Sequence, residues 1–313
     1  MDISEYANSV FEQPWWLNTV APNQWREVVI KEEGKIVARW AFVEKGKSII
    51  MPMLTQTLGI WISEDILEYD KYDRQQKKIL NKLIDEIISK KGISLCLNSN
   101  NTFFMPFYWR GFKVTPFVSY RLNDLTNLDA IYTGFSSNVK NSIERASKKL
   151  KIVESDNIDK LISLVDNTFR RKKMQRPWSV DLIKDIYYSA KQNNGGKLLF
   201  AIDKEKNVHS GTLFIYDQKV FYNLISGSDY KYKNSGAATL LLWEGIKHAA
   251  TTSMIFDFEG SMKEGINRFY AQFGGKQVIY YGIYKPTEKL FRQKSQKLIR
   301  FLKNRVKKRF VYR

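Results

Sequence analysis

Residues 221–275 follow one another as strand, loop, helix, strand and helix, and this order constrains the fold more than any other feature of the chain. We expect the strands at 221–225 and 255–260 and the helices from about Ala237 and at 264–273. Small residues between a strand and a helix let the backbone approach a ligand closely. The free amides of the first helical turn then favour an anion. The segment therefore predicts a phosphate site at the start of its first helix.

The loop before that helix has the spacing basic-x-x-Gly-x-Ala, in which Lys233 supplies a cation and Gly236 the close approach. The alternative is that Asn234–Gly236 is only a turn and an N-cap for the next helix. In the ligand-site interpretation, the contacts come from the strand end and the loop, at Leu224, Ser226, Lys233, Asn234, Ser235, Gly236, Ala237 and Ala238.

This spacing resembles the pyrophosphate loop of the GNAT acyltransferase superfamily, which has Arg or Gln where this chain has Lys233. With 256–262 and 265–275, the segment resembles the second half of the Fem family, whose members resemble two fused GNAT domains and attach amino acids to peptidoglycan precursors. Residues 11–17, 34–38 and 51–59 resemble the opening domain of a sister group of double-GNAT acyltransferases in surface-polysaccharide pathways. The resemblance spans nearly the whole chain. It implies an α/β fold of the α+β kind, with mixed sheets in two tandem GNAT-like domains.

A length of 313 residues suits two domains, each with its own core. We expect an N-terminal GNAT-like domain at 1–125, a C-terminal one at 126–288 and a basic amphipathic helix at 289–313. Only the second domain carries a phosphate-loop candidate, because the first has the acidic stretch 64–68 instead. We therefore expect the second domain to bind the acyl donor and the first to shape an acceptor cleft.

The net charge of +19 is concentrated in residues 289–313, which hold eleven Lys or Arg and no acid. Such a helix either lies on an anionic membrane surface or docks on the protein with a solvated charged face. No apolar run reaches the length of a membrane span and the start lacks signal-peptide features, which predicts a cytoplasmic protein, at most peripheral to the inner face of the membrane. The single cysteine, Cys96, excludes an intrachain disulfide, and the distant His209 and His248 predict no metal site.

Acyl transfer from a thioester to an amine needs a base near the nitrogen and an acid for the departing thiolate. Asp257 and Glu259 alternate along a predicted strand, so they would face the same side, and their repulsion would raise one pKa as suits a general base. The alternative is a structural role, with Asp257 paired or capping a helix. Tyr270 stands four residues before Gly274, the spacing at which GNAT enzymes usually carry the tyrosine thought to protonate the coenzyme A thiolate. The alternative for Tyr270 is a core position.

Acceptor contacts are predicted at four positions. Trp16 and Gln56 follow from family position. Lys140 and Arg145 lie on a predicted helix at 135–150, where they meet an acceptor phosphate or are merely solvated.

The sequence thus predicts an N-acyltransferase that moves an acyl group from acyl-coenzyme A, without a metal, to an amine of a cell-envelope precursor such as a nucleotide- or lipid-linked amino sugar. Fem enzymes generally have Arg-Phe-Lys where this chain has Tyr270 after Arg268 and Phe269, and that lysine is associated with the aminoacyl-tRNA donor. Its replacement favours coenzyme A. The alternatives are an aminoacyl-tRNA-dependent peptidoglycan bridge enzyme and a non-catalytic nucleic-acid-binding protein that uses the basic tail.

Overall fold

The computed structural model describes residues 3–69, 73–260 and 262–286. The basic helix predicted at 289–313 lies outside these residues, as does the interpretation of it as a membrane contact. Among the described residues, no helix is long and apolar enough to cross a membrane.

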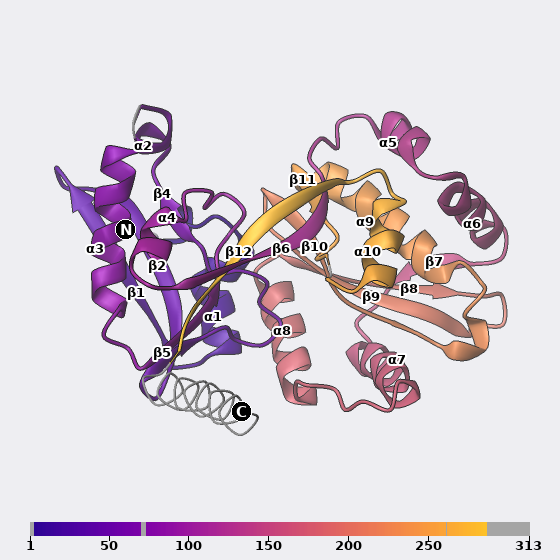
Figure 1. Cartoon of the computed structure of the whole chain (residues 1–313). Coiled ribbons are helices and arrows are strands. Elements are labelled where there is room, and N and C mark those ends of the chain that lie inside the picture. Colours follow the sequence, from indigo (N-terminus) through magenta and orange to yellow (C-terminus); the bar gives the residue numbers. More distant parts are fainter. Residues whose placement is uncertain (1–2, 70–72, 261, 287–313) are drawn as a thin grey trace, which may run out of the picture.

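One mixed sheet of 12 strands runs through both halves of the molecule (Figure 1). Its strand order is β1-β2-β3-β5-β12-β6-β11-β10-β9-β8-β7, and β4 pairs with β2 off this path. The strands are β1 (Trp25–Glu32), β2 (Lys35–Lys45), β3 (Ser48–Ile50), β4 (Ile60–Ile62), β5 (Gly92–Cys96), β6 (Lys113–Leu122), β7 (Lys151–Glu154), β8 (Gly196–Ile202), β9 (Val208–Tyr216), β10 (Val220–Ser228), β11 (Ile255–Asp257) and β12 (Lys276–Lys285).

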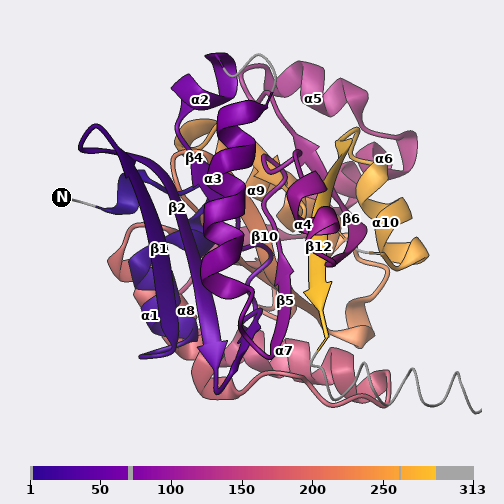
Figure 2. The same cartoon turned by 60° about the vertical axis from the view of Figure 1, so that its left-hand side comes forward.

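Helices cover both faces of this sheet (Figure 2). The α-helices are α1 (Pro14–Val20), α2 (Glu64–Tyr69), α3 (Arg74–Ile87), α4 (Met105–Trp109), α5 (Leu128–Gly134), α6 (Ser137–Ser147), α7 (Ile158–Arg171), α8 (Val180–Gln192), α9 (Ala237–Thr252) and α10 (Glu264–Ala271), with short 3₁₀ turns at Ile3–Glu5, Val10–Glu12 and Tyr230–Tyr232. Their ends follow ordinary capping chemistry. At the start of α8, for example, the Ser179 hydroxyl accepts a hydrogen bond from the Leu182 amide at 3.0 Å.

The last described strand, β12, joins the two halves (Figures 1 and 2). It lies between β5 and β6 and pairs antiparallel with both, while β6 pairs on its other side with β11. The chain therefore returns from its second half into its first. The division predicted at residue 125 stays a prediction, and β12 crosses it.

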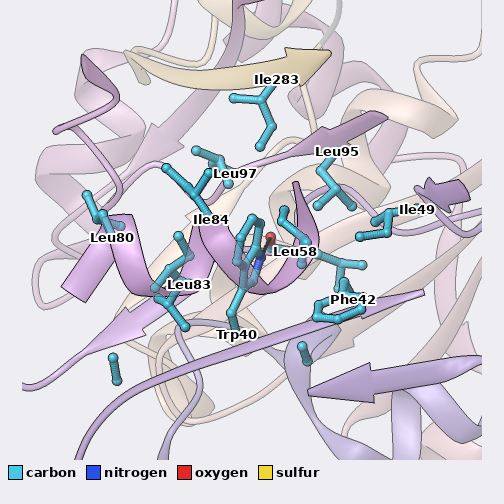
Figure 3. Packing of buried hydrophobic residues seen from close by; sticks show 14 of the residues in the cluster. Trp40, Phe42, Ile49, Leu58, Leu80, Leu83, Ile84, Leu95, Leu97 and Ile283 are labelled. Carbon is cyan, nitrogen blue, oxygen red and sulfur yellow. Dashed lines mark hydrogen bonds between the residues drawn. The ribbon is translucent and has the colours of Figure 1, made fainter. Parts of the chain in front are cut away.

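Three buried apolar clusters support the sheet. The first packs α3 against the strands of the first half and includes Trp40, Leu83 and Ile283, the last of which comes from β12 (Figure 3). The other two lie on opposite faces of the second half: one beneath α9, the other beneath α7 and α8. Phe11 and Trp16 from the start of the chain belong to the cluster beneath α7 and α8, so each half contributes residues to the other's core.

The predicted α/β fold with a mixed sheet is confirmed. Strand β3 ends at Ile50, two residues before Pro52, which cannot donate a ladder hydrogen bond. The strand predicted at 255–260 ends at Asp257, which changes the surroundings of Glu259. The helix predicted at 135–150 is shorter, and α5 precedes it as a separate helix.

Replacing Ile283 with Ala is expected to destabilise the protein by about 2–5 kcal/mol, since it removes buried methylenes at the joint between the halves. Ile283 is 1% exposed, whereas Ile279 on the same strand is 48% exposed. Ile279→Ala is therefore the matched control. Urea unfolding of both variants gives the comparison, and equal losses would show that β12 does not anchor the first core.

Candidate active site

The loop between β10 and α9 fixes Gly236 in a conformation that requires glycine. Its φ is +77°, and an added Cβ would lie 2.8 Å from the carbonyl oxygen of Ser142 on α6. The N-terminus of α9 thus packs closely against α6. Gly236 is the N-cap residue of this helix, and the Ser235 hydroxyl before it accepts from the Ala237 amide at 3.3 Å.

A cavity of about 250 Å³ lies at this N-terminus, and the predicted loop residues Lys233 to Ala238 all line it. Ser142, His209 and Phe269 line its other sides. The first-turn amides of a helix favour an anion, so the cavity is suited to a phosphate.

A small cluster of cations and an aromatic ring borders this loop. The Lys233 ammonium donates to the Tyr230 hydroxyl at 3.0 Å and lies 4.5 Å from the ring centroid. This hydrogen bond lowers the pKa of Tyr230, and the Lys233 charge acts in the same direction. Arg171 lies over the same ring at 4.8 Å, which adds a second positive charge beside the cavity.

A larger cavity of about 570 Å³ adjoins the first, because Ser142, Thr239 and Phe269 line both. Arg145 of α6 and Lys148, which follows this helix, lie on its wall. Arg145, predicted as an acceptor contact, is therefore next to the loop cavity, on the side predicted for the donor.

The pairing of β10 with β11 stops at Tyr222 and Asp257. Beyond this point β10 continues to Ser228 beside β9 only, with an irregular register between Asn223 and Ile225. The bulge falls at the predicted contact Leu224. Ser226 does not line the loop cavity and instead donates its hydroxyl proton to Asn223 Oδ1 at 2.9 Å.

Tyr270 and Asn223 meet where the two strands part. The Asn223 side-chain amide donates to the Tyr270 hydroxyl at 3.2 Å. Burial raises the pKa of Tyr270 to about 12, and Glu259 acts in the same direction. Tyr270 thus keeps its proton at neutral pH. That proton has no acceptor among the described residues.

Glu259 follows the end of β11 with a left-handed φ of 50°, so it does not lie on the strand as predicted. Its Oε1 atom is buried and has no partner in the part of the chain that the structure describes. Burial raises the pKa of Glu259 well above its usual value, and the charge of Asp257 adds to this effect.

Asp257 has a different environment. It is fully buried, and its Oδ2 accepts from Arg121 Nε at 2.6 Å. Its Oδ1 accepts from the Ser119 hydroxyl at 2.5 Å and from the Glu259 amide at 2.7 Å. Because these bonds occupy the carboxylate, its surroundings fit the structural alternative, in which it holds the backbone that carries Glu259.

The remaining acceptor predictions have less support. Trp16 is 0% exposed in the core, and its indole nitrogen donates to Thr55 at 3.0 Å, so it cannot contact a ligand in this structure. Gln56 is half-buried, with a side-chain nitrogen that has no partner among the described residues. Lys140 donates to the Thr133 carbonyl at 3.1 Å and does not line the cavity beside Arg145.

Sequence reasoning missed Asn223, Arg121 and His209. Asn223 stands inside an apolar strand, which was the available signal for a buried polar contact. Arg121 gave no signal, because its partner Asp257 is 136 residues away. His209 lines the loop cavity and stacks on Tyr232 at 3.8 Å between ring centroids. In the described residues, no group of three or more His, Cys, Asp or Glu side chains is placed to hold a metal ion.

Comparison with known proteins places this site in a recognised domain. The family model described as "Acetyltransferase (GNAT) domain" matches residues 136–265, which include the loop cavity and Glu259. No curated protein matches the sequence.

Solved structures resemble the chain over most of its length. The crystal structure of FemX superposes with a TM-score of 0.69 at 13% identity, covering 91% of this chain and 94% of that one. A tandem GNAT protein from the clavulanic acid biosynthesis pathway gives 0.53 at 8% identity, covering 85% and 84%. L-PGS from Bacillus licheniformis gives 0.53 at 10% identity, covering 88% and 87%. Residues 136–265 therefore match an acetyltransferase (GNAT) domain, and the whole chain shares the fold of FemX and of the tandem GNAT protein.

Proposed function

We propose that the protein is an N-acyltransferase that moves an acyl group from acyl-coenzyme A to an amine of a cell-envelope precursor, such as an amino sugar on a nucleotide or lipid carrier. The observation that carries this proposal is the location of Tyr270 and Glu259. Tyr270 contacts Asn223, just beyond the end of the β10–β11 pairing, and Glu259 follows the end of β11. Both lie in the same half of the chain as the loop cavity at Gly236. The proposal assigns the donor to the second half and leaves the first half to shape the acceptor cleft.

In this proposal the donor pyrophosphate binds at the start of α9, where Lys233 and the first-turn amides line the cavity. Arg145 and Lys148 then flank the nucleotide end of the donor in the adjoining cavity. The thioester extends toward the gap between β10 and β11.

Glu259 is the proposed base. Its carboxyl group is unpaired, and burial together with the charge of Asp257 raises its pKa, an environment in which proteins often place a general acid or base. The acceptor nitrogen attacks the thioester carbonyl, the new C–N bond forms, and the amine proton passes to Glu259. The C–S bond then breaks, and Tyr270 donates its proton to the sulfur. Its hydroxyl already accepts from Asn223, which leaves its hydrogen free for this transfer.

An aminoacyl-tRNA donor is the second candidate, because the fold resembles that of FemX. Tyr270 in place of the lysine of Fem enzymes favours coenzyme A. Assaying acyl-coenzyme A and aminoacyl-tRNA side by side distinguishes the two donors. Transfer from the tRNA alone would remove the coenzyme A assignment.

Replacing Ala238 with Asp is expected to weaken binding of acetyl-coenzyme A by at least about tenfold, because a carboxylate would then occupy the place of the phosphate. An acidic residue in a first helical turn does not disfavour the helix, so the protein stays folded. Ala130→Asp in the first turn of α5 is the matched control, since Ala130 does not line this cavity. Calorimetry measures all three proteins. Absence of binding by the unchanged protein with any acyl-coenzyme A would contradict the donor assignment.

Replacing Tyr270 with Phe is expected to lower kcat about 10²-fold with little change in donor affinity, since the phenol acts only when charge develops on sulfur. Tyr284→Phe on β12, where the side chain is 38% exposed, is the control. Single-turnover rates and donor titrations separate the two effects. A rate near that of the unchanged protein would return Tyr270 to a packing role.

Glu259 also makes stability depend on pH in a defined direction. Its pKa is raised in the folded state, so between the unfolded and folded pKa values only the unfolded chain loses the proton. The free energy of unfolding then falls by about 1.4 kcal/mol for each pH unit across that window and is flat above it. Glu259→Gln is expected to remove this loss, and urea unfolding from pH 4 to 8 measures it. Glu264→Gln, on the exposed side of α10, is the control. A Glu259→Gln protein with the unchanged pH profile would show that Glu259 is not the group responsible.

A further inference from the structure

A separate cavity of about 290 Å³ lies where the two halves of the molecule meet. The first half contributes Asn8, Asn98 and Asn100, and the end of β6 contributes Arg121 and Asn123. The starts of β10 and β11 close the other side, which includes Tyr222. The cavity therefore forms only when both halves are in place.

This cavity opens on the face of the sheet opposite to the donor cavity. Along β10, Phe221 belongs to the cluster beneath α9, while Tyr222 belongs to the cluster beneath α7 and α8. Adjacent residues of a strand point to opposite faces, and Tyr222 pairs in register with Asp257. A ligand here is consequently a different molecule from one held at the start of α9.

The hydroxyl of Tyr222 is an available hydrogen-bonding group on the wall of the cavity. Tyr222 is only 1% exposed and lines the cavity, yet its hydroxyl has no hydrogen-bond partner among the described residues. Burial raises the pKa of Tyr222 well above its ordinary value, so the group is a neutral donor and acceptor. The hydroxyl oxygen itself is not fully buried, so it is accessible from the cavity and available to hydrogen-bond a bound polar group.

The charges around the cavity favour an uncharged ligand. Arg121 donates to Asp257 and, at 2.7 Å, to the Ser99 hydroxyl. The Lys219 ammonium donates to the Ala7 carbonyl at 3.0 Å. Both cations thus have partners within the protein. So do the side chains of Asn8, which donates to Glu12, and of Asn98, whose oxygen accepts from the Asn100 backbone amide. The remaining polar groups are the side-chain amides of Asn100 and Asn123 and the phenol of Tyr222, and each amide offers a donor and an acceptor side by side, as hydroxyl and acetamido groups require.

We propose that this cavity binds an uncharged sugar moiety that carries hydroxyl and acetamido groups. Arg121 at its wall bonds Asp257, which in turn accepts from the Glu259 amide, so the cavity lies two hydrogen bonds from the proposed base. The moiety is the sugar of the acceptor, and this identity rests on the proposed function. Binding of the sugar does not depend on any donor.

Saturation-transfer NMR on the full chain, without donor, tests the proposal with N-acetylglucosamine as the probe. The sugar is expected to bind, and Tyr222→Phe and the double variant Asn100→Ala, Asn123→Ala are each expected to weaken it by about tenfold through lost hydrogen bonds. Tyr216→Phe on the adjacent strand β9, outside the cavity lining, should leave binding unchanged. Glucose, which lacks the acetamido group, should bind more weakly.

Absence of binding by the unchanged protein, or equal binding by all variants, overturns the proposal. Displacement of the sugar by inorganic phosphate also overturns it, because the cavity would then be an anion site. A parallel titration with acetyl-coenzyme A keeps the two hypotheses distinct. Sugar binding without donor binding refutes the proposed function but not the cavity assignment, and the reverse result does the opposite.

Discussion

The buried ion pair between Arg121 and Asp257 is the interaction on which the rest of this structure depends. The two side chains meet at 2.6 Å, and Asp257 is fully buried. A buried carboxylate is tolerated only when it is paired and hydrogen-bonded, and removal of one partner costs about 3–5 kcal/mol. Arg121 and Ser119 come from β6 and Asp257 from β11, so the pair fastens the two halves of the sheet where the pairing of β10 and β11 stops.

This ion pair also determines the backbone position and the pKa of Glu259. By accepting the Glu259 amide hydrogen, Asp257 holds the chain as it leaves β11, and its charge adds to burial in raising the pKa of Glu259. Asp257 and Glu259 are two residues apart, yet the Asp257 carboxylate is fully hydrogen-bonded and the Glu259 carboxyl group has an unpaired oxygen. Proteins give two neighbouring acids separate roles by placing them in different environments of this kind. The unpaired Glu259 lowers stability at neutral pH, a cost consistent with a functional position.

Local sequence patterns predicted the parts of this structure that local physics controls. The predicted loop at 233–238, whose small residues lie within one segment, lines a cavity. The insertion of β12 between β5 and β6 could not be predicted, because it depends on pairing across more than 150 residues. For the same reason the sequence did not indicate that Arg121 pairs with Asp257. The prediction of Trp16 as a contact came from family position, which carries no information on its burial in the core. The strand period could not show that β11 ends before Glu259, since that end depends on hydrogen bonds to Ser119 and Asp257.

The two cavities lie on opposite faces of one sheet, and this arrangement restricts where any transfer between their ligands can occur. A continuous sheet of paired strands is a barrier to both molecules. Beyond Tyr222 and Asp257 the strands β10 and β11 are no longer paired, so groups approaching from the two faces can meet there. Tyr270 of α10 lies at this gap through its bond to Asn223, and Glu259 follows the end of β11. In the proposed function, this gap is therefore the place where the thioester and the amine react, with Tyr270 as the acid and Glu259 as the base.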